Sequence, residues 1–170
     1  MHSLGDLAMM RTFIFFRRRI YMPISECCNI GVVCCEADAS IPQIAHLMRK
    51  HHVGDVVVVR HEDGARIPIG IITDRDIVVE TIAEQVDMDL LTAGDIMSSP
   101  LITAHENESF AESLRLMRHH KIRRLPIIDE KGVLYGIVSA GDIIHLLTLE
   151  LSMLTTTMTE QPVVESQVRP

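Results

Sequence analysis

Hydrophobic and polar residues alternate along this 170-residue chain in an order that occurs twice. Short apolar segments predict strands at 31–34 and at 100–103. An amphipathic helix is predicted after each strand. In the second of these helices Phe110, Leu114 and Met117 lie at i, i+4 and i+7, which places them on one apolar face. The pattern therefore predicts two β-α units of similar construction.

Both helices carry start signals. Ser109 and Glu112 have the spacing of a capping box, in which each side chain bonds the other residue's backbone at the helix start. Ser40 and Gln43 repeat this spacing in the first copy, and Pro42 lies in the first turn, where a missing N–H group costs little. Each helix is therefore predicted to begin directly after its serine.

Two further strands and a second helix complete each copy. The apolar strands DVVVV and RLPII are followed by polar turns and then by the strands IGIIT and YGIVS, so each pair is predicted to form a hairpin. A second helix is predicted to open at 74–76 and at 141–142. Each copy is thus β-α-β-β-α over roughly 55 residues, which is small for an independent core. We expect the two copies to pack against each other.

The doubled order reflects an internal repeat. When the chain is shifted by 69 positions, LMR at 47–49 aligns with LMR at 116–118. After a loop that differs by three residues, GIITDRDI at 70–77 aligns with GIVSAGDI at 136–143. A repeat of this kind indicates two copies of one structural unit.

This ordered set of motifs resembles the cystathionine-β-synthase (CBS) domain pair, or Bateman module. The resemblance rests on IMSSPLITAHENES, LMRHHKIRRLPIID and the doubled eight-residue motif, and it covers about residues 22–150. It implies an α/β (α+β) fold in which two β-α-β-β-α repeats pack sheet to sheet as a pseudo-two-fold pair. The expected domains are a leader at 1–21, CBS repeat 1 at 22–85, CBS repeat 2 at 86–151 and a flexible tail at 152–170.

The resemblance also implies a function. Such modules bind adenine nucleotides (AMP, ADP or ATP, in some members S-adenosylmethionine or a cyclic dinucleotide) in clefts between the repeats, regulate another protein and pair into disc-like dimers. The chain resembles a stand-alone member of bacterial or archaeal type, because the motifs fill most of its length. We therefore expect a cytoplasmic nucleotide sensor that needs no cofactor, forms a homodimer and regulates a partner protein.

The doubled motif has a physical reason to hold a nucleotide. A helix N-terminus offers unpaired N–H groups and a positive dipole end to a phosphate, and Thr73 or Ser139 adds a hydroxyl there. Asp76 or Asp142, one turn later, could accept hydrogen bonds from a ribose, as acidic residues do in dinucleotide sites. The same spacing also fits plain helix capping, which requires no ligand.

In the family that the chain resembles, each cleft joins this motif from one repeat to the first two strands of the other. Cleft A would then combine Thr73, Arg75 and Asp76 with Thr103, Arg123 and Arg124, and cleft B would combine Ser139 and Asp142 with Cys34, Gly54 and Asp55.

The two clefts are predicted to differ in charge. Arg123 and Arg124 suit a phosphate in cleft A, because guanidinium groups make charge-assisted hydrogen bonds. Gly54 and Asp55 hold the matching positions in cleft B, and a carboxylate repels a phosphate at 4 Å by about 1–4 kcal/mol. Cleft A is therefore predicted to bind a phosphorylated adenosine, while cleft B binds weakly, binds a less charged ligand or stays empty. Alternatively, both arginines pair with surface carboxylates.

Composition argues against several other classes. The net charge of −7 gives no overall basic field for a nucleic acid. No apolar run approaches the roughly 18–20 residues of a membrane-spanning helix. No P-loop, nucleophile-elbow or zinc-protease motif occurs, so no enzymatic activity is expected. The alternative function is a structural dimerisation or adaptor module with vestigial clefts.

Cysteines and histidines raise a metal or redox alternative. The cysteines form adjacent pairs, Cys27–Cys28 and Cys34–Cys35, which do not match the C-x-x-C spacing of common zinc sites. We expect reduced thiols that pack as small apolar residues. The histidine pairs His51–His52 and His119–His120 lie at helix ends, where adjacent side chains point in different directions. We expect solvated histidines and no metal site, with contact of His119 or His120 to a phosphate as the alternative.

The two ends of the chain are predicted to lie outside the repeats. An ordered pattern begins at Met22, directly before PISECC, so the leader could be an upstream extension translated from an early start. A disordered leader and an amphipathic membrane-surface segment are the other interpretations. From about 152 the Thr-rich sequence SMLTTTMTEQPVVESQVRP predicts a fraying helix end followed by disorder.

Overall fold

The computed structural model describes residues 23–168, with side chains described for 23–156, so the predicted leader lies outside the described residues. Both repeats have the predicted β-α-β-β-α order. The first contains β1 (Cys34–Cys35), α2 (Ile41–His51), β2 (Asp55–Glu62), β3 (Ala65–Thr73), the short helix α3 (Asp74–Ile77) and the π-helical turn η2 (Val78–Ala83). The second contains β4 (Ala104–His105), α5 (Phe110–His120), β5 (Arg124–Ile128), β6 (Leu134–Ser139) and α6 (Ala140–Val168). Three short elements precede or connect them: η1 (Ile24–Glu26), η3 (Met88–Leu90) and α4 (Ala93–Ile96).

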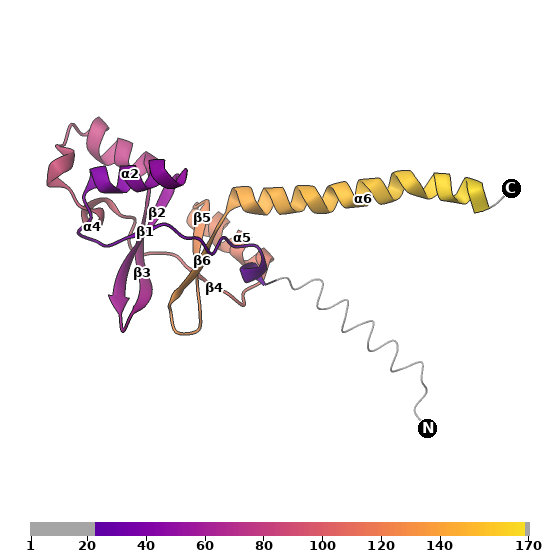
Figure 1. Cartoon of the computed structure of the whole chain (residues 1–170), viewed down its shortest axis with the longest axis horizontal. Coiled ribbons are helices and arrows are strands. Elements are labelled where there is room, and N and C mark those ends of the chain that lie inside the picture. The colour runs from indigo at the N-terminus through magenta and orange to yellow at the C-terminus, as the bar shows by residue number, and fades with distance from the viewer. Residues whose placement is uncertain (1–22, 169–170) are drawn as a thin grey trace, which may run out of the picture.

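Each repeat forms a three-stranded sheet with the same topology (Figure 1). β1 runs parallel to β2, and β2 runs antiparallel to β3; β4, β5 and β6 repeat this arrangement. The first strand of each sheet begins later than predicted, at Cys34 instead of 31 and at Ala104 instead of 100. Register pairs with the central strand begin at these later residues, and of the described residues before Cys34 only Val33 hydrogen-bonds to that strand, where its carbonyl accepts from the Val57 N–H at 3.0 Å.

The predicted helix starts are confirmed. The Ser40 N–H donates to Oε1 of Gln43 at 2.9 Å, and the Gln43 N–H donates to Oγ of Ser40 at 3.4 Å, which completes a capping box. Only half of the second predicted box forms: the Glu112 N–H donates to Ser109, while the Glu112 carboxylate pairs with Arg115 instead.

Aliphatic side chains form two cores and a layer that joins them. One core packs α2 against the first sheet and includes Ile44 and Ile72, and a matching core in the second repeat includes Leu125. A third cluster, around Val57 and Leu134, lies where the two sheets meet. The repeats therefore bury apolar sheet faces against each other, as expected from the small size of one copy.

The two repeats exchange the segments that precede them in the chain. η1 lies on the second repeat, where the Ile24 N–H donates to the Glu108 carbonyl at 2.8 Å and the Ile24 side chain is fully buried in the core. α4 lies on the first repeat, where the Ala93 N–H donates to the Ala39 carbonyl at 2.8 Å. Each repeat is therefore completed by a segment that precedes the other one.

The glycine that opens each eight-residue motif makes room for these exchanged segments. A Cβ atom on Gly70 would collide with the Met97 side chain, and one on Gly136 would lie 2.7 Å from Sγ of Cys28. The backbones of the two segments also lie close together there, because the Ser98 N–H donates to the carbonyl of Ile71, the residue after Gly70, at 2.9 Å. The first residue of the doubled motif thus serves packing between segments.

The last helix, α6, begins on the second sheet and projects away from both repeats (Figure 1). It continues to Val168, beyond the helix end predicted near 152; the predicted flexibility of this tail stays a prediction. Hydroxyl groups are satisfied inside the helix, since Thr148 and Ser152 each donate at 2.8 Å to the carbonyl four residues earlier. Among the described helices, none combines the length and the apolar composition that a bilayer crossing requires.

Replacing Ile24 with alanine should lower the free energy of unfolding by about 2–5 kcal/mol, because this side chain is fully buried in the second core. Ile30→Ala is the matched control, since Ile30 is 69% exposed and should change stability little. Urea titration measures both variants. Wild-type stability of Ile24→Ala would show that η1 does not complete the second repeat.

Candidate functional site

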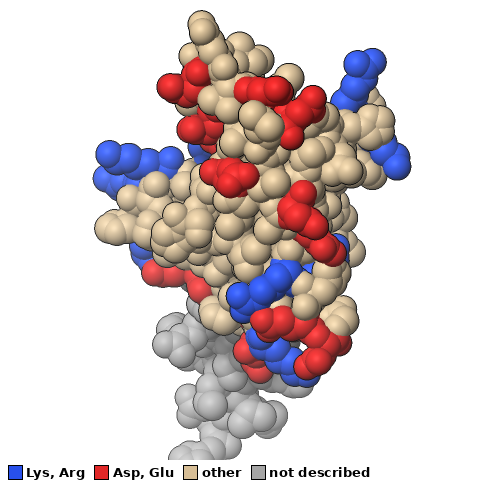
Figure 2. All heavy atoms as spheres, turned by 90° about the vertical axis from the view of Figure 1, so that its left-hand side faces the viewer, with Lys and Arg blue, Asp and Glu red and all other residues tan. Residues whose placement is uncertain are grey.

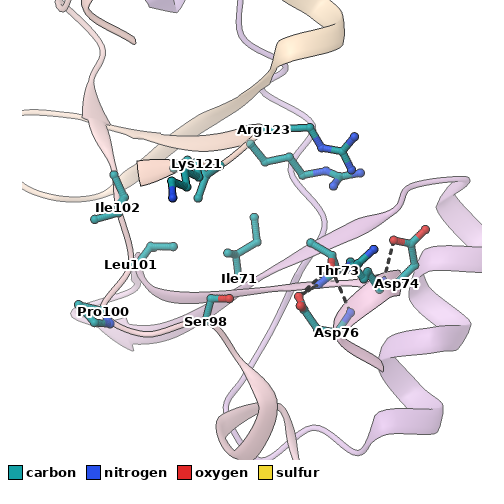
Figure 3. A pocket seen from close by; sticks show the side chains of 13 residues that line it. Ile71, Thr73, Asp74, Asp76, Ser98, Pro100, Leu101, Ile102, Lys121 and Arg123 are labelled. Atoms are coloured by element: carbon teal, nitrogen blue, oxygen red, sulfur yellow. Dashed lines mark hydrogen bonds between the residues drawn. The ribbon is translucent and has the colours of Figure 1, made fainter. Parts of the chain in front are cut away.

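Cleft A is a cavity of about 220 Å³ between the two repeats (Figure 3). Most of its predicted residues line this cavity, namely Thr73, Arg75, Asp76, Arg123 and Arg124. Thr103 is not among the lining residues, and its neighbour Ile102 takes that place. The lining is completed by Ile71, Asp74, Ser98, Pro100, Leu101, Lys121 and Ile122.

The junction of β3 and α3 forms one wall of cleft A. The Thr73 N–H and hydroxyl both donate to Oδ2 of Asp76 at 2.7 Å, and the Asp76 N–H donates to Oγ1 of Thr73 at 3.3 Å. The two residues therefore cap α3, as the capping interpretation predicted. Oδ1 of Asp76 accepts no hydrogen bond from the described residues, so the cap leaves one carboxylate oxygen available to a ligand.

A third copy of the same cap shows that capping alone does not make a site. The Thr92 N–H and hydroxyl donate to Oδ2 of Asp95 at 2.8 and 2.7 Å at the start of α4. These hydrogen bonds hold the pKa of the fully exposed Asp95 below its ordinary value. Neither residue lines cleft A or cleft B. What distinguishes Thr73 and Asp76 is their position beside a cavity with cations opposite.

The opposite wall of cleft A is basic. Lys121 and Arg123 come from the second repeat and lie across the cavity from Thr73 and Asp76 (Figure 3). Lys121 ends α5 in the left-handed conformation, with φ 56°, and was not predicted as a site residue. Its counterpart in the first repeat, His52, has the same left-handed conformation and lines cleft B. The alignment of the two repeats, which pairs Lys121 with His52, is therefore the sequence signal that could have identified both as site residues.

Apolar side chains form the remaining surface of cleft A. Ile71 points into the cavity from β3, and Leu101 and Ile102 approach it from the segment before β4 (Figure 3). Sequence reasoning did not assign these residues to the site, because their apolar character fits a core equally well. His119 and His120 do not line cleft A; their rings lie edge to face, with centroids 4.8 Å apart.

Cleft B is a cavity of about 310 Å³ on the matching side of the pair. Ser139 and Asp142 line it and repeat the cap of cleft A, with the Ser139 N–H and hydroxyl donating to Oδ2 of Asp142 at 2.8 and 2.7 Å. Cys34 does not line the cavity but packs in the layer between the sheets. The full lining is Asn29, Gly31, Val32, Val33, His52, Val53, Gly54, Asp55, Arg124, Ile137, Ser139 and Asp142.

The predicted charge contrast between the clefts needs a correction at Arg124. Its Nε lies against Oδ1 of Asp55 in an ion pair, and it lines cleft B as well as cleft A. Burial raises the pKa of Asp55, Arg124 opposes this effect, and Asp74 and Asp142 add to it. Of the two arginines, Arg124 does pair with a carboxylate, but its partner is the partly buried Asp55 of cleft B and not a surface carboxylate, as the alternative interpretation had it. No ion pair of Arg123 occurs within residues 23–156.

The surface around the repeats carries mixed charge. On the face shown in Figure 2, Lys and Arg side chains are interspersed with Asp and Glu, and no continuous basic surface appears. This distribution agrees with the net charge of −7 and offers no footprint for a nucleic-acid backbone on this face.

The four cysteines are free thiols. Burial raises the pKa of all four, and it raises that of Cys35 to about 11, with Cys34 and Asp38 acting in the same direction. Within the described part of the chain, no three His, Cys, Asp or Glu side chains are grouped closely enough to hold a metal ion. The thiols therefore pack as small, protonated side chains.

Comparison with known proteins identifies the two repeats. The CBS domain model matches the chain at residues 24–81 and at 93–149, which confirms the resemblance. Uncharacterized protein MK0525 of Methanopyrus kandleri is 39% identical over 123 residues, covering 72% of this chain and 61% of that protein. This chain therefore matches less than two thirds of that relative's length.

Two solved structures share the arrangement of the repeats. The CBS domain pair of protein MJ0100, in complex with 5′-methylthioadenosine and S-adenosyl-L-methionine, has a TM-score of 0.65 and 25% identity, covering 74% of this chain and 99% of that one. Hypoxic Response Protein I, with two coordinated zinc ions, has a TM-score of 0.64 and 31% identity, covering 73% of this chain and 98% of that one. Both confirm the mixed α+β fold.

Cys35 should react slowly with iodoacetamide in the folded protein. A pKa of about 11 instead of 9.0 leaves ~100-fold less thiolate at pH 8, and only the thiolate is nucleophilic. The labelling rate, followed by mass spectrometry of the Cys35 peptide, should rise as the pH increases toward 11. Urea-unfolded protein is the control. Equal rates for folded and unfolded protein at pH 8 would contradict the buried, protonated thiol.

Proposed function

The chain belongs to the CBS domain family, and on this premise we propose that it is a regulatory module that binds an adenine nucleotide in cleft A. Cleft A carries the proposal because it combines three contacts that a nucleotide needs. Apolar side chains such as Ile71 offer a surface to the base, and Asp76 offers a carboxylate oxygen to the ribose. Lys121 and Arg123 offer cations to the phosphate.

The choice of ligand follows from charge. The similarity to a CBS pair that holds adenosine derivatives supports an adenosine-type ligand. The basic wall of cleft A favours AMP, ADP or ATP over S-adenosylmethionine, whose sulfonium group is positive. Cleft B holds Asp55 and Asp142 beside Arg124 and His52, so it suits a less charged adenosine ligand or none.

We propose that binding is transmitted through a homodimer. Val78 in η2 and Ile144 in α6 occupy matched positions and are 50% and 63% exposed, with Ile82 and Leu147 exposed beside them. An apolar surface of this kind commonly marks an interface. A nucleotide that bridges the two repeats would shift the populated dimer geometry, which a partner protein in the cytoplasm would detect. The module needs neither catalysis nor a cofactor for this role.

Calorimetric titration with AMP, ATP and S-adenosylmethionine tests the nucleotide proposal. Asp76→Ala and Arg123→Ala should each weaken AMP binding by roughly 10- to 100-fold, because each removes a charged hydrogen-bonding group from cleft A. Asp142→Ala, in cleft B, should retain AMP binding in cleft A. Asp95→Ala is the matched control, since it removes the same kind of cap away from both cavities.

Equal AMP affinities for wild type, Asp76→Ala and Arg123→Ala would contradict the assignment of cleft A. If the wild type binds no nucleotide, after denaturation has shown that no ligand was co-purified, the adaptor function replaces the sensor. The exposed apolar surface on η2 and α6 specifically favours that second candidate, because a dimerisation module needs the surface but not the clefts.

The double substitution Ile144→Asp and Leu147→Asp should convert the dimer into a monomer, because it places charges on the proposed interface. Light scattering after size-exclusion chromatography measures the molar mass. Ile30→Asp, at an equally exposed isoleucine outside η2 and α6, is the control and should remain dimeric. A monomeric wild type would rule out this interface.

A further inference from the structure

Arg124 occupies a special place between the two clefts. It is the only described residue that lines both cavities. Arg124 and Asp55 hold matching positions, the first residue of the central strand in each repeat, and they contact each other in an ion pair. Positions that a pseudo-two-fold axis exchanges can touch only close to that axis. From this place Arg124 reaches both clefts, while its partner Asp55 lines cleft B only.

The ion pair is partly withdrawn from water. The Arg124 and Asp55 side chains are 28% and 18% exposed, whereas the surface pair of Arg60 and Glu62 on the same strand β2 is 59% and 54% exposed. Gly54 makes the approach possible, because a Cβ atom there would lie 2.9 Å from Nη2 of Arg124. Because the pair is partly buried, removal of one partner would leave the other charge poorly solvated, so this pair is harder for a ligand to displace than a surface pair.

We propose that Asp55 and a phosphate in cleft A compete for Arg124, so that Asp55 controls nucleotide affinity through this arginine. The proposal rests on the proposed function of cleft A. A phosphate that draws the guanidinium toward cleft A must break the ion pair with Asp55. Arg123 carries no such restraint, since it has no ion pair to the described residues.

The competition has a consequence for cleft B. Once Arg124 has moved, Asp55 remains in cleft B with Asp142, and Asp74 lies near enough to act on it electrostatically. Cleft B then becomes more negative, so it rejects a second phosphate and favours a neutral or cationic adenosine ligand. The coupling is reciprocal: a neutral or cationic ligand in cleft B strengthens nucleotide binding in cleft A by the factor by which the nucleotide strengthens binding of that ligand.

A double-mutant cycle tests the competition, with AMP affinity measured by calorimetry at pH 8 on the full chain. Asp55→Asn should tighten AMP binding by at least about fivefold, because Arg124 is no longer held. In an Arg124→Gln background the same substitution should have no effect. Glu62→Gln is the matched control, since it breaks the surface pair at the other end of β2 and should leave affinity unchanged.

The outcomes separate this proposal from the function on which it rests. AMP binding that is unchanged by Asp55→Asn overturns the competition and leaves the nucleotide function standing. Equal tightening in both backgrounds also overturns it, because Asp55 would then act by direct repulsion. Absence of AMP binding in all proteins overturns both.

A second measurement uses the unaltered protein and does not depend on the folding of Arg124→Gln. The Asp55 side-chain carboxyl carbon, assigned by its loss in Asp55→Asn, is followed by carbon-13 NMR. Saturating AMP should shift this resonance, because the carboxylate loses its guanidinium partner. An unchanged resonance while AMP is bound would overturn the proposal.

Discussion

The apolar layer between the two sheets is the interaction on which the rest of the structure depends. A single β-α-β-β-α unit is too small to bury a sufficient core, so each sheet covers the other around Val57, Val59 and Leu134. This packing places the end of β3 beside the start of β5, and the end of β6 beside the start of β2. Both clefts therefore follow from the pairing of the repeats, and neither could exist in one repeat alone.

Local signals made much of this arrangement predictable. Capping serines fixed the starts of α2 and α5, and the doubled eight-residue motif fixed where α3 and α6 begin beside the clefts. Strand placement was less predictable, because β1 and β4 are short and begin later than the apolar pattern indicated. Cys34, the first residue of β1, packs between the sheets, whereas Val32 and Val33 just before it line cleft B, so the late start of β1 decides which of these residues reach the site.

Two features of the site could not come from local sequence. Lys121 reaches cleft A because α5 ends in a left-handed residue there, a detail of backbone conformation. The pairing of Arg124 with Asp55 depends on contact between matched positions of the two repeats, which lie far apart in the chain. From the sequence, Arg124 was assigned to cleft A and Asp55 to cleft B, which predicted a large charge difference between the clefts. Because the two side chains contact each other, that difference is smaller than predicted. Cleft A keeps its basic character through Lys121 and Arg123.

The most direct test of the account is a crystal structure of the protein grown with AMP. We predict that AMP lies in cleft A, with its ribose at Asp76 and its phosphate at Lys121 and Arg123 on the opposite repeat. Such a complex would show a ligand that bridges both repeats, as a regulatory module requires. AMP bound only in cleft B, or a well-ordered cleft A that stays empty at saturating AMP, would contradict the central claim.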